Sequence, residues 1–153
     1  MLFMIACEAH SQQIRIDMVS FQNDGVDIPN LDFKKISRWL NEVASGYNRR
    51  IGDLNYMFCT DEIILKTNRD FLDHDYYTDI ITFDYTVGDK VGADILISLD
   101  TVRSNAKQLG VAYEEELHRV IVHGLLHLCG IKDKTAEERN EMESAENAAL
   151  RLL

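Results

Sequence analysis

Alternating runs of apolar and polar residues divide the chain into strands and helices. Apolar residues spaced three to four positions apart predict amphipathic helices, and short runs rich in β-branched and aromatic residues predict strands. The expected helices cover residues 31–47, 60–72, 99–110, 113–129 and 135–153, and the expected strands cover residues 14–22, 53–59, 78–85 and 93–99. Helices around a small, about four-stranded sheet indicate a single domain of the α+β class, with mixed α/β character.

Capping residues support several of these boundaries. Asp32 is suited to be the N-cap of the first helix, because its carboxylate can accept a hydrogen bond from a free backbone N–H. Thr135 and Glu138 form a capping-box pattern at the start of the last helix. A Gly-containing turn at residues 87–92 separates the last two strands, and this short connection predicts an antiparallel pair.

The helix expected over residues 60–72 begins at Thr60 or Asp61. At helical spacing, its inward side chains are expected to be Ile64, Leu65 and either Phe71 or Leu72.

Composition and charge narrow the class of protein. The chain has 153 residues, three cysteines far apart and a formal net charge of −10. No apolar run approaches the ~20 residues of a membrane span, and isolated thiols fit a reducing compartment, so we expect a cytoplasmic protein. The negative charge argues against broad electrostatic binding to nucleic acid. Met18 is an alternative start, which would make residues 1–17 an N-terminal extension and residues 18–153 the single domain.

The segment VHGLLHLCGIKDK, residues 122–134, carries the strongest candidate chemistry. His123 and His127 are four residues apart on one expected helix, and this spacing places both imidazoles on the same face. Gly130 can end the helix and reverse the chain, which lets Asp133 fold back toward the two histidines. Three protein ligands with an open fourth position form the pattern of a catalytic zinc site. We therefore expect one Zn²⁺ per chain, held by His123, His127 and Asp133.

The same residues also allow less specific interpretations. A histidine pair at this spacing occurs by chance, and Asp133 is also explained as a solvated loop carboxylate between Lys132 and Lys134. Gly124, next to His123, favours the metal site over a chance pair. A glycine inside a helix costs about 1 kcal/mol of stability against alanine, so its presence indicates close packing or a space kept clear. Gly124 also stands where a zinc peptidase carries its catalytic glutamate, which argues against peptide hydrolysis.

Three co-linear segments resemble motifs of the YbeY family of bacterial rRNA maturation proteins. HGLLHLCGIKDK is similar to that family's H-G-x-L-H-L-x-G-[YF]-D-H signature, TNRDFLDHDYYTDIITFDY to its L-N-x-x-Y-R-x-K-D-x-P-T-D-V-L-S-F segment, and GADILIS to its L-G-D-I-x-I segment. The resemblance implies a small sheet with helices around it and a zinc helix near its centre. It also implies a zinc-dependent, single-strand endoribonuclease of 16S rRNA 3′-end maturation and ribosome quality control.

Carried over position by position, the resemblance implies that His123 and His127 are the first two metal ligands. Asp133 stands where the family has a third histidine, and aspartate is an acceptable zinc ligand. Leu72 stands where the family has an arginine that is important for work on RNA, and Arg69, about one helical turn earlier, is the candidate replacement.

The hypothesis of RNA hydrolysis at this metal gives roles to further residues. Arg69, Lys132 and Lys134 are expected to face phosphates of the substrate. His74 and Asp79 are expected to handle protons or to support the metal ligands, with a surface loop residue and a residue that braces a strand as the respective alternatives.

Three functions remain open at this point. The first is the metal-dependent endoribonuclease, with rRNA and ribosomal subunits as partners. No binding to DNA or to a membrane is expected. The second is a ribosome-assembly factor with mainly structural zinc, which Leu72 and the net charge of −10 favour. The third is a zinc peptidase or another hydrolase. The oligomeric state and the metal used in cells stay open, because a His₂Asp site also suits Fe²⁺ or Ni²⁺.

Overall fold

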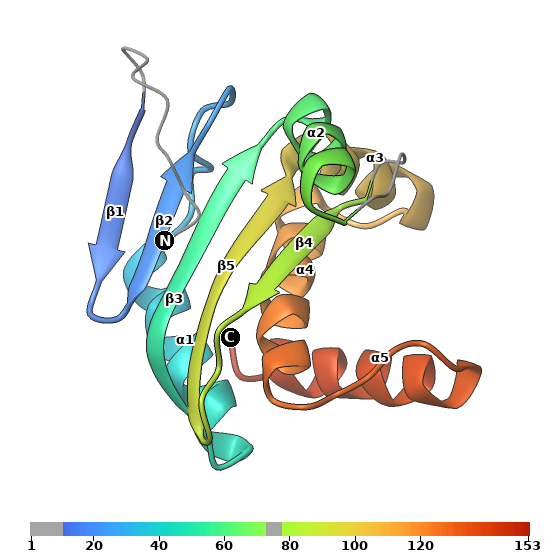
Figure 1. The fold of residues 1–153 in the computed structure, drawn as a ribbon. Helices are drawn as coiled ribbons and strands as arrows, with labels where there is room; N and C mark the ends of the chain where they lie inside the picture. The colour runs from blue at the N-terminus through green and yellow to red at the C-terminus, as the bar shows by residue number, and fades with distance from the viewer. Residues whose placement is uncertain (1–10, 73–77) are drawn as a thin grey trace.

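The computed structural model describes residues 11–72 and 78–153, where strands and helices are mixed along the chain and the last elements are helices (Figure 1). The strands are β1 (Gln13–Ile16), β2 (Val19–Asn23), β3 (Arg50–Cys59), β4 (Ile80–Asp84) and β5 (Lys90–Ser98). The helices are α1 (Phe33–Gly46), α2 (Asp61–Leu72), α3 (Leu99–Leu109), α4 (Tyr113–Leu128) and α5 (Ala136–Leu150). None of these helices is both long and apolar enough to cross a membrane.

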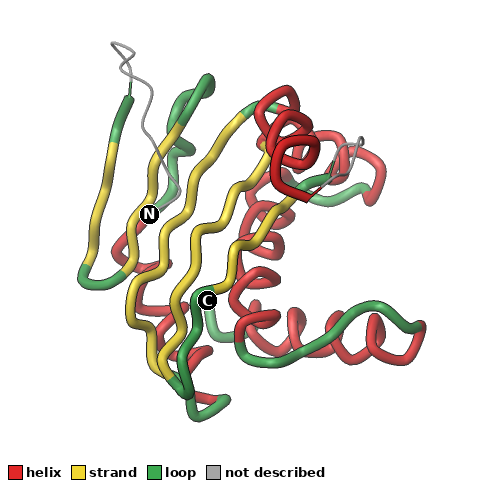
Figure 2. The backbone as a smooth tube through the Cα atoms, in the orientation of Figure 1, coloured by secondary structure: helices red, strands yellow, loops and turns green. Residues whose placement is uncertain are grey.

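The described strands form one mixed sheet in the order β1-β2-β3-β5-β4 (Figure 2). The three inner strands β2, β3 and β5 are parallel, and the two outer strands β1 and β4 run antiparallel to their neighbours. The predicted antiparallel pair of β4 and β5 is therefore confirmed. The architecture is α+β, as predicted, with a sheet of five strands in place of about four.

The additional strand comes from the segment 14–22, which was predicted to be one strand. The chain turns at Asp17 and Met18, so that β1 folds back on β2 with Ile16 opposite Val19. Asp17 has a φ of 54°, a left-handed conformation that aspartate tolerates better than most residues. The alternation of apolar and polar residues breaks at Met18 and Val19, which is where the hairpin turns into β2.

Most predicted helix boundaries are confirmed by their caps. The Asp32 side chain accepts a hydrogen bond from the backbone N–H of Lys35, and Thr135 with Glu138 forms the complete capping box of α5. In α2 the N-cap is Thr60, whose hydroxyl accepts from the backbone N–H of Ile63.

The predicted inward face of α2 is wrong at its C-terminal end. Phe71 is 60% exposed and Leu72 is 39% exposed, whereas Ile64 and the polar Asn68 are buried. The Asn68 amide donates to the Thr78 hydroxyl at 3.3 Å. On α2, Asn68 thus stands where the apolar stripe would continue, and it makes a polar contact with Thr78, just before β4.

Side chains on the two faces of the sheet pack into separate clusters. On β3, Tyr56 and Phe58 belong to the main core with residues of α1, α4 and α5, whereas Met57 packs on the opposite face with Ile64 of α2. This alternation follows from the two-residue period of a strand. Helix α4 contributes to the main core, so one side of it is covered by the sheet, as Figure 1 shows.

Gly124 fixes how closely α4 approaches the sheet. A Cβ atom at this position would lie 3.0 Å from Cδ1 of Ile95 and 3.1 Å from Cδ1 of Ile80. One turn earlier, the carbonyl of Ile121 accepts a hydrogen bond of 2.9 Å from the buried Tyr56 hydroxyl. The glycine that the sequence singled out thus serves close packing of α4 on β4 and β5.

Replacement of Gly124 by valine is expected to lower the free energy of unfolding by about 1–3 kcal/mol, because the added methyl groups overpack the interface with Ile80 and Ile95. Gly46, in α1, has open space around its Cα, so Gly46→Val is the matched control and should change stability by less than about 0.5 kcal/mol. Urea unfolding of both variants measures the difference. Equal stabilities would contradict this role of Gly124.

Candidate metal centre

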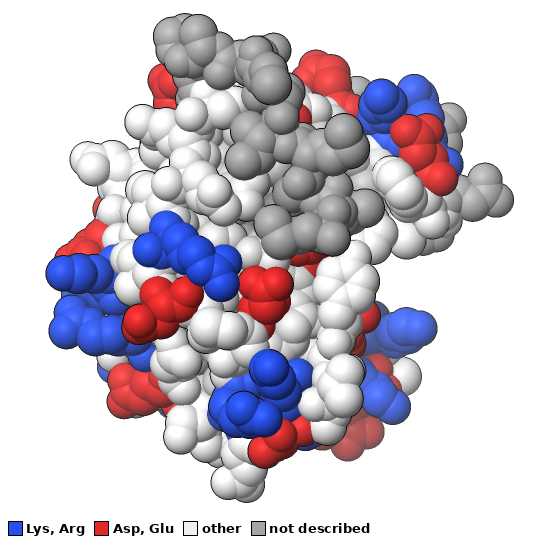
Figure 3. Space-filling model, turned by 60° about the vertical axis from the view of Figure 1, so that its left-hand side comes forward, with Lys and Arg blue, Asp and Glu red and all other residues white. Residues whose placement is uncertain are grey.

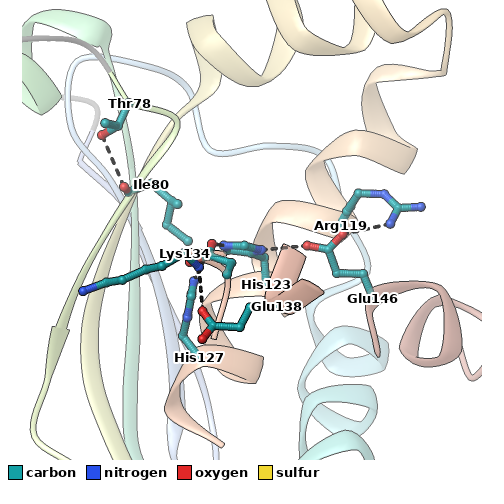
Figure 4. A network of polar contacts seen from close by, with 9 residues as sticks. Thr78, Ile80, Arg119, His123, His127, Lys134, Glu138 and Glu146 are labelled. Atoms are coloured by element: carbon teal, nitrogen blue, oxygen red, sulfur yellow. Dashed lines mark hydrogen bonds and ion pairs between the residues drawn. The ribbon is translucent and has the colours of Figure 1, made fainter. Parts of the chain in front are cut away.

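The last two turns of α4 place two histidines side by side. His123 and His127 project from one face of the helix (Figure 4), and their ring centroids are 4.5 Å apart. Gly130 follows the helix with a φ of 98°, a conformation that favours glycine and reverses the chain. The reversal brings Asp133 back to the histidine face, as the sequence predicted.

Three ligand atoms converge at this point. Oδ2 of Asp133 lies 3.1 Å from Nε2 of His127 and 3.4 Å from Nε2 of His123. Ligand atoms at about 2.05 Å from a tetrahedral zinc ion are separated by about 3.3 Å, so the spacing suits such an ion. Imidazole nitrogen and carboxylate oxygen are also the donor types that zinc takes in catalytic sites. Among the described residues, these three form the cluster that could hold a metal.

The cluster is accessible from solvent. The side chains of His123, His127 and Asp133 are 22%, 32% and 35% exposed, respectively. His123 and Asp133 also line a cleft of about 450 Å³. A metal held by three protein atoms at the wall of a cleft would keep a side open to a water molecule or a substrate, which is the pattern of catalytic and not of structural zinc.

A carboxylate that sequence reasoning missed contacts His123 from behind. Oε2 of Glu146, on α5, lies 2.7 Å from Nδ1 of His123. Arg119 forms an ion pair of 3.0 Å with the other oxygen of Glu146 (Figure 4). Met142, Glu146 and Ala149 form the buried face of α5, so a glutamate within an otherwise apolar stripe was the signal that could have identified it.

The electrostatics of His123 reflect these neighbours. Burial by itself would lower the pKa of the imidazole, but the hydrogen bond and charge of Glu146, together with Asp133 and Asp79, outweigh burial and raise the pKa. Asp79 lies just before β4, where burial raises the pKa of its carboxyl and the nearby His123 opposes that rise. The predicted Asp79 is therefore within electrostatic reach of His123.

The other predicted residues occupy different places. Lys132 and Lys134 are exposed on either side of Asp133. In Figure 4 the Lys134 side chain extends from this loop away from Glu146. Arg69 is exposed on α2, next to the Asn68 that contacts Thr78. His74 lies outside the described residues.

His118 takes no part in the cluster. Its half-buried ring packs edge-on against Trp39 at a centroid distance of 6.0 Å, and burial lowers the pKa of the imidazole. This position gives His118 a structural role in the packing of α4 on α1.

These features define an α+β protein with an accessible candidate site for one metal ion. The family model described as Endoribonuclease YbeY matches residues 18–153, and the chain belongs to this family.

Individual relatives agree with the family match. The chain is 56% identical over 136 residues to Endoribonuclease YbeY of Phocaeicola vulgatus, which covers 89% of this chain and 99% of that protein. It is 55% identical to Endoribonuclease YbeY of Bacteroides thetaiotaomicron, with 86% and 96% covered. The solution structure of a Thermotoga maritima protein matches with a TM-score of 0.59 and 22% identity, over 86% of this chain and 89% of that one. This last likeness concerns the fold alone.

Replacement of Asp133 by alanine is expected to remove the metal from the protein, because the two histidines alone leave the site one ligand short. Mass spectrometry of tag-free protein should find about one zinc per chain in the wild type and little in Asp133→Ala. Asp133→His should keep the metal, since imidazole can replace the carboxylate. Glu141→Ala, an exposed change on α5, is the control. Full zinc content in Asp133→Ala would show that Asp133 is not a ligand.

His118→Gln is expected to reduce the loss of stability in acid. Because the pKa of His118 is lowered in the folded state, the unfolded chain takes up the proton first as pH falls below about 6.5, and this uptake favours unfolding. The free energy of unfolding of metal-free wild type should therefore fall more between pH 7.5 and pH 5.0 than that of His118→Gln. An identical pH dependence of the two proteins would rule this effect out.

Proposed function

We propose that this chain is a zinc-dependent endoribonuclease that cleaves single-stranded RNA in 16S rRNA 3′-end maturation and ribosome quality control. Two findings support the proposal: membership of the Endoribonuclease YbeY family over residues 18–153 and the convergence of His123, His127 and Asp133 beside a cleft. The convergence is the observation that carries it, because it supplies a site for chemistry and not only for binding.

In the proposed reaction, His123, His127 and Asp133 hold the metal through two neutral nitrogens and one anionic oxygen. A zinc ion there would supply positive charge to a phosphodiester oxygen and lower the pKa of a water molecule. The carboxylate of Asp133 makes the centre less positive than three imidazoles would. Asp79 is in electrostatic reach of His123 and is the candidate to exchange a proton with the reacting water or the leaving oxygen.

RNA would have to be held by local cations, because the net charge is −10. On the face shown in Figure 3, lysine and arginine side chains are interspersed with aspartate and glutamate, and they form no continuous basic surface. Lys132 and Lys134 flank the metal ligand Asp133 and are the proposed phosphate contacts nearest to it. Arg69 is proposed to take over the role of the family arginine, whose position is Leu72.

A ribosome-assembly factor with structural zinc is the second candidate. It is favoured by the same net charge and by Leu72, which is 39% exposed and cannot bind phosphate. The peptidase alternative has less support, because position 124 faces Ile80 and Ile95 of the sheet, so that a glutamate placed there would meet the core and not a substrate.

His127→Ala and Asp133→Ala are each expected to lower the rate of cleavage of a labelled single-stranded RNA by at least about 100-fold, because charge stabilisation of the transition state is lost. A chelator should abolish cleavage by the wild type, and added zinc should restore it. Lys134→Ala should weaken RNA binding with a smaller effect on the rate at saturating RNA.

His118→Ala is the control for a histidine away from the cluster and should retain activity. Full cleavage by a metal-free His123→Ala protein would overturn the nuclease proposal. Zinc-loaded wild type that binds ribosomal subunits but cleaves no RNA would favour the assembly factor.

A further inference from the structure

We propose that Glu146 is a positioning residue: it fixes the ring of His123 so that Nε2 faces the metal, and Arg119 holds Glu146 in place. This inference rests on the proposed metal site and adds to it a part contributed by another helix. None of the three ligands comes from α5, yet α5 supplies the carboxylate that contacts the first ligand.

The two nitrogens of His123 have different neighbours. Nδ1 lies 2.7 Å from Oε2 of Glu146, and Nε2 lies 3.4 Å from Oδ2 of Asp133 on the metal side. An ionised carboxylate only accepts hydrogen bonds, so contact with Glu146 places a proton on Nδ1. The lone pair of a neutral ring is then on Nε2, the atom that points into the cluster.

Glu146 is itself held from one side. Its side chain is 11% exposed, and its other oxygen accepts a hydrogen bond of 3.0 Å from Nη1 of Arg119. Nη2 of Arg119 donates to Oδ1 of Asn147 at 2.9 Å. Arg119 and His123 are four residues apart on α4, so they lie on the same face. The carboxylate is thus clamped between an arginine and a histidine of one helix.

This arrangement matches the carboxylate–histidine–metal pairing that orients ligands and increases their basicity. A simple structural role, in which Arg119 and Glu146 only join α4 to α5, would not require the contact to Nδ1. The two roles differ in what they predict: a joint between helices affects unfolding, whereas a positioning residue affects the affinity for metal and the tautomer of His123.

His127 provides an internal comparison. Its Nε2 also contacts Asp133, but within the described part of the chain no carboxylate is found at its Nδ1. The effect of Glu146 should therefore be confined to His123.

The test is a zinc titration of tag-free protein against a chromophoric chelator, with wild type, Glu146→Gln, Glu146→Ala and Glu143→Gln. Loss of a carboxylate behind a metal-binding histidine typically weakens affinity about 10–100-fold. We expect a loss in this range for Glu146→Ala and a smaller one for Glu146→Gln, whose amide oxygen can still accept from Nδ1. Glu143 is exposed on the same helix and lines the same cleft, so Glu143→Gln should bind zinc as the wild type does.

A second readout separates positioning from stability. Nitrogen NMR of the metal-free protein at alkaline pH, where the imidazole rings are neutral, should find the His123 ring protonated at Nδ1 in the wild type and mixed between tautomers in Glu146→Ala, with His127 unchanged. Arg119→Gln should cause a smaller loss of affinity, which is not additive with that of Glu146→Ala because both act through one contact.

Wild-type zinc affinity in Glu146→Ala would overturn this inference while leaving the metal site intact, even if the variant unfolds more easily. Absence of zinc binding in the wild type would overturn the metal site itself, and this inference with it. Zinc binding with the expected loss in Glu146→Ala, but without RNA cleavage, would support the positioning role and count against the nuclease.

Discussion

The close contact of α4 with the sheet is the constraint on which the candidate site depends. Gly124 lets the helix approach Ile80 and Ile95, and the hydroxyl of Tyr56 bonds the carbonyl of Ile121. With that face fixed against β4 and β5, the 3.6-residue period of the helix turns His123 and His127 away from the core. A helix free to rotate or slide would lose this placement, so packing and chemistry are set by the same sixteen-residue segment.

The site is then completed from both ends of the following loop. Gly130 reverses the chain so that Asp133 reaches the histidines, and the capping box at Thr135 and Glu138 starts α5 directly afterwards. Because α5 begins there, it crosses back past the end of α4 (Figure 1) and places Glu146 behind His123. A short loop with strong local signals thus determines the relation between the candidate metal ligands and the carboxylate that contacts one of them.

Local signals explain how much of this was predictable. The caps at Asp32 and Thr135 concern residues close in sequence and were identified correctly, and Thr60 was one of the two candidates for the cap of α2. The β1–β2 hairpin was missed because its turn rests on Asp17 alone, without a Gly or Pro to mark it. Glu146 was missed because its contact with His123 depends on how two helices meet, and its place in the buried stripe of α5 was the one local sign of it.

Charge sets the limits within which a nuclease of this type would work. With a net charge of −10, the protein repels RNA at long range, and short-range attraction has to come from the metal and a few cations. An aspartate among the ligands reduces that attraction further than a third histidine would. For the proposed nuclease, the net charge and Asp133 therefore predict a low affinity for free RNA. Binding would depend more on contacts made when the RNA is part of a larger assembly.

X-ray absorption at the zinc edge of the loaded, tag-free protein tests the central claim most directly. Two imidazole nitrogens are expected at about 2.0–2.1 Å, with oxygen atoms from Asp133 and solvent completing the shell. His127→Ala, which like Asp133→Ala leaves the site one ligand short, should hold little zinc. A sulfur ligand at about 2.3 Å, as Cys129 would give, or a shell without paired imidazoles would contradict the site described for this chain.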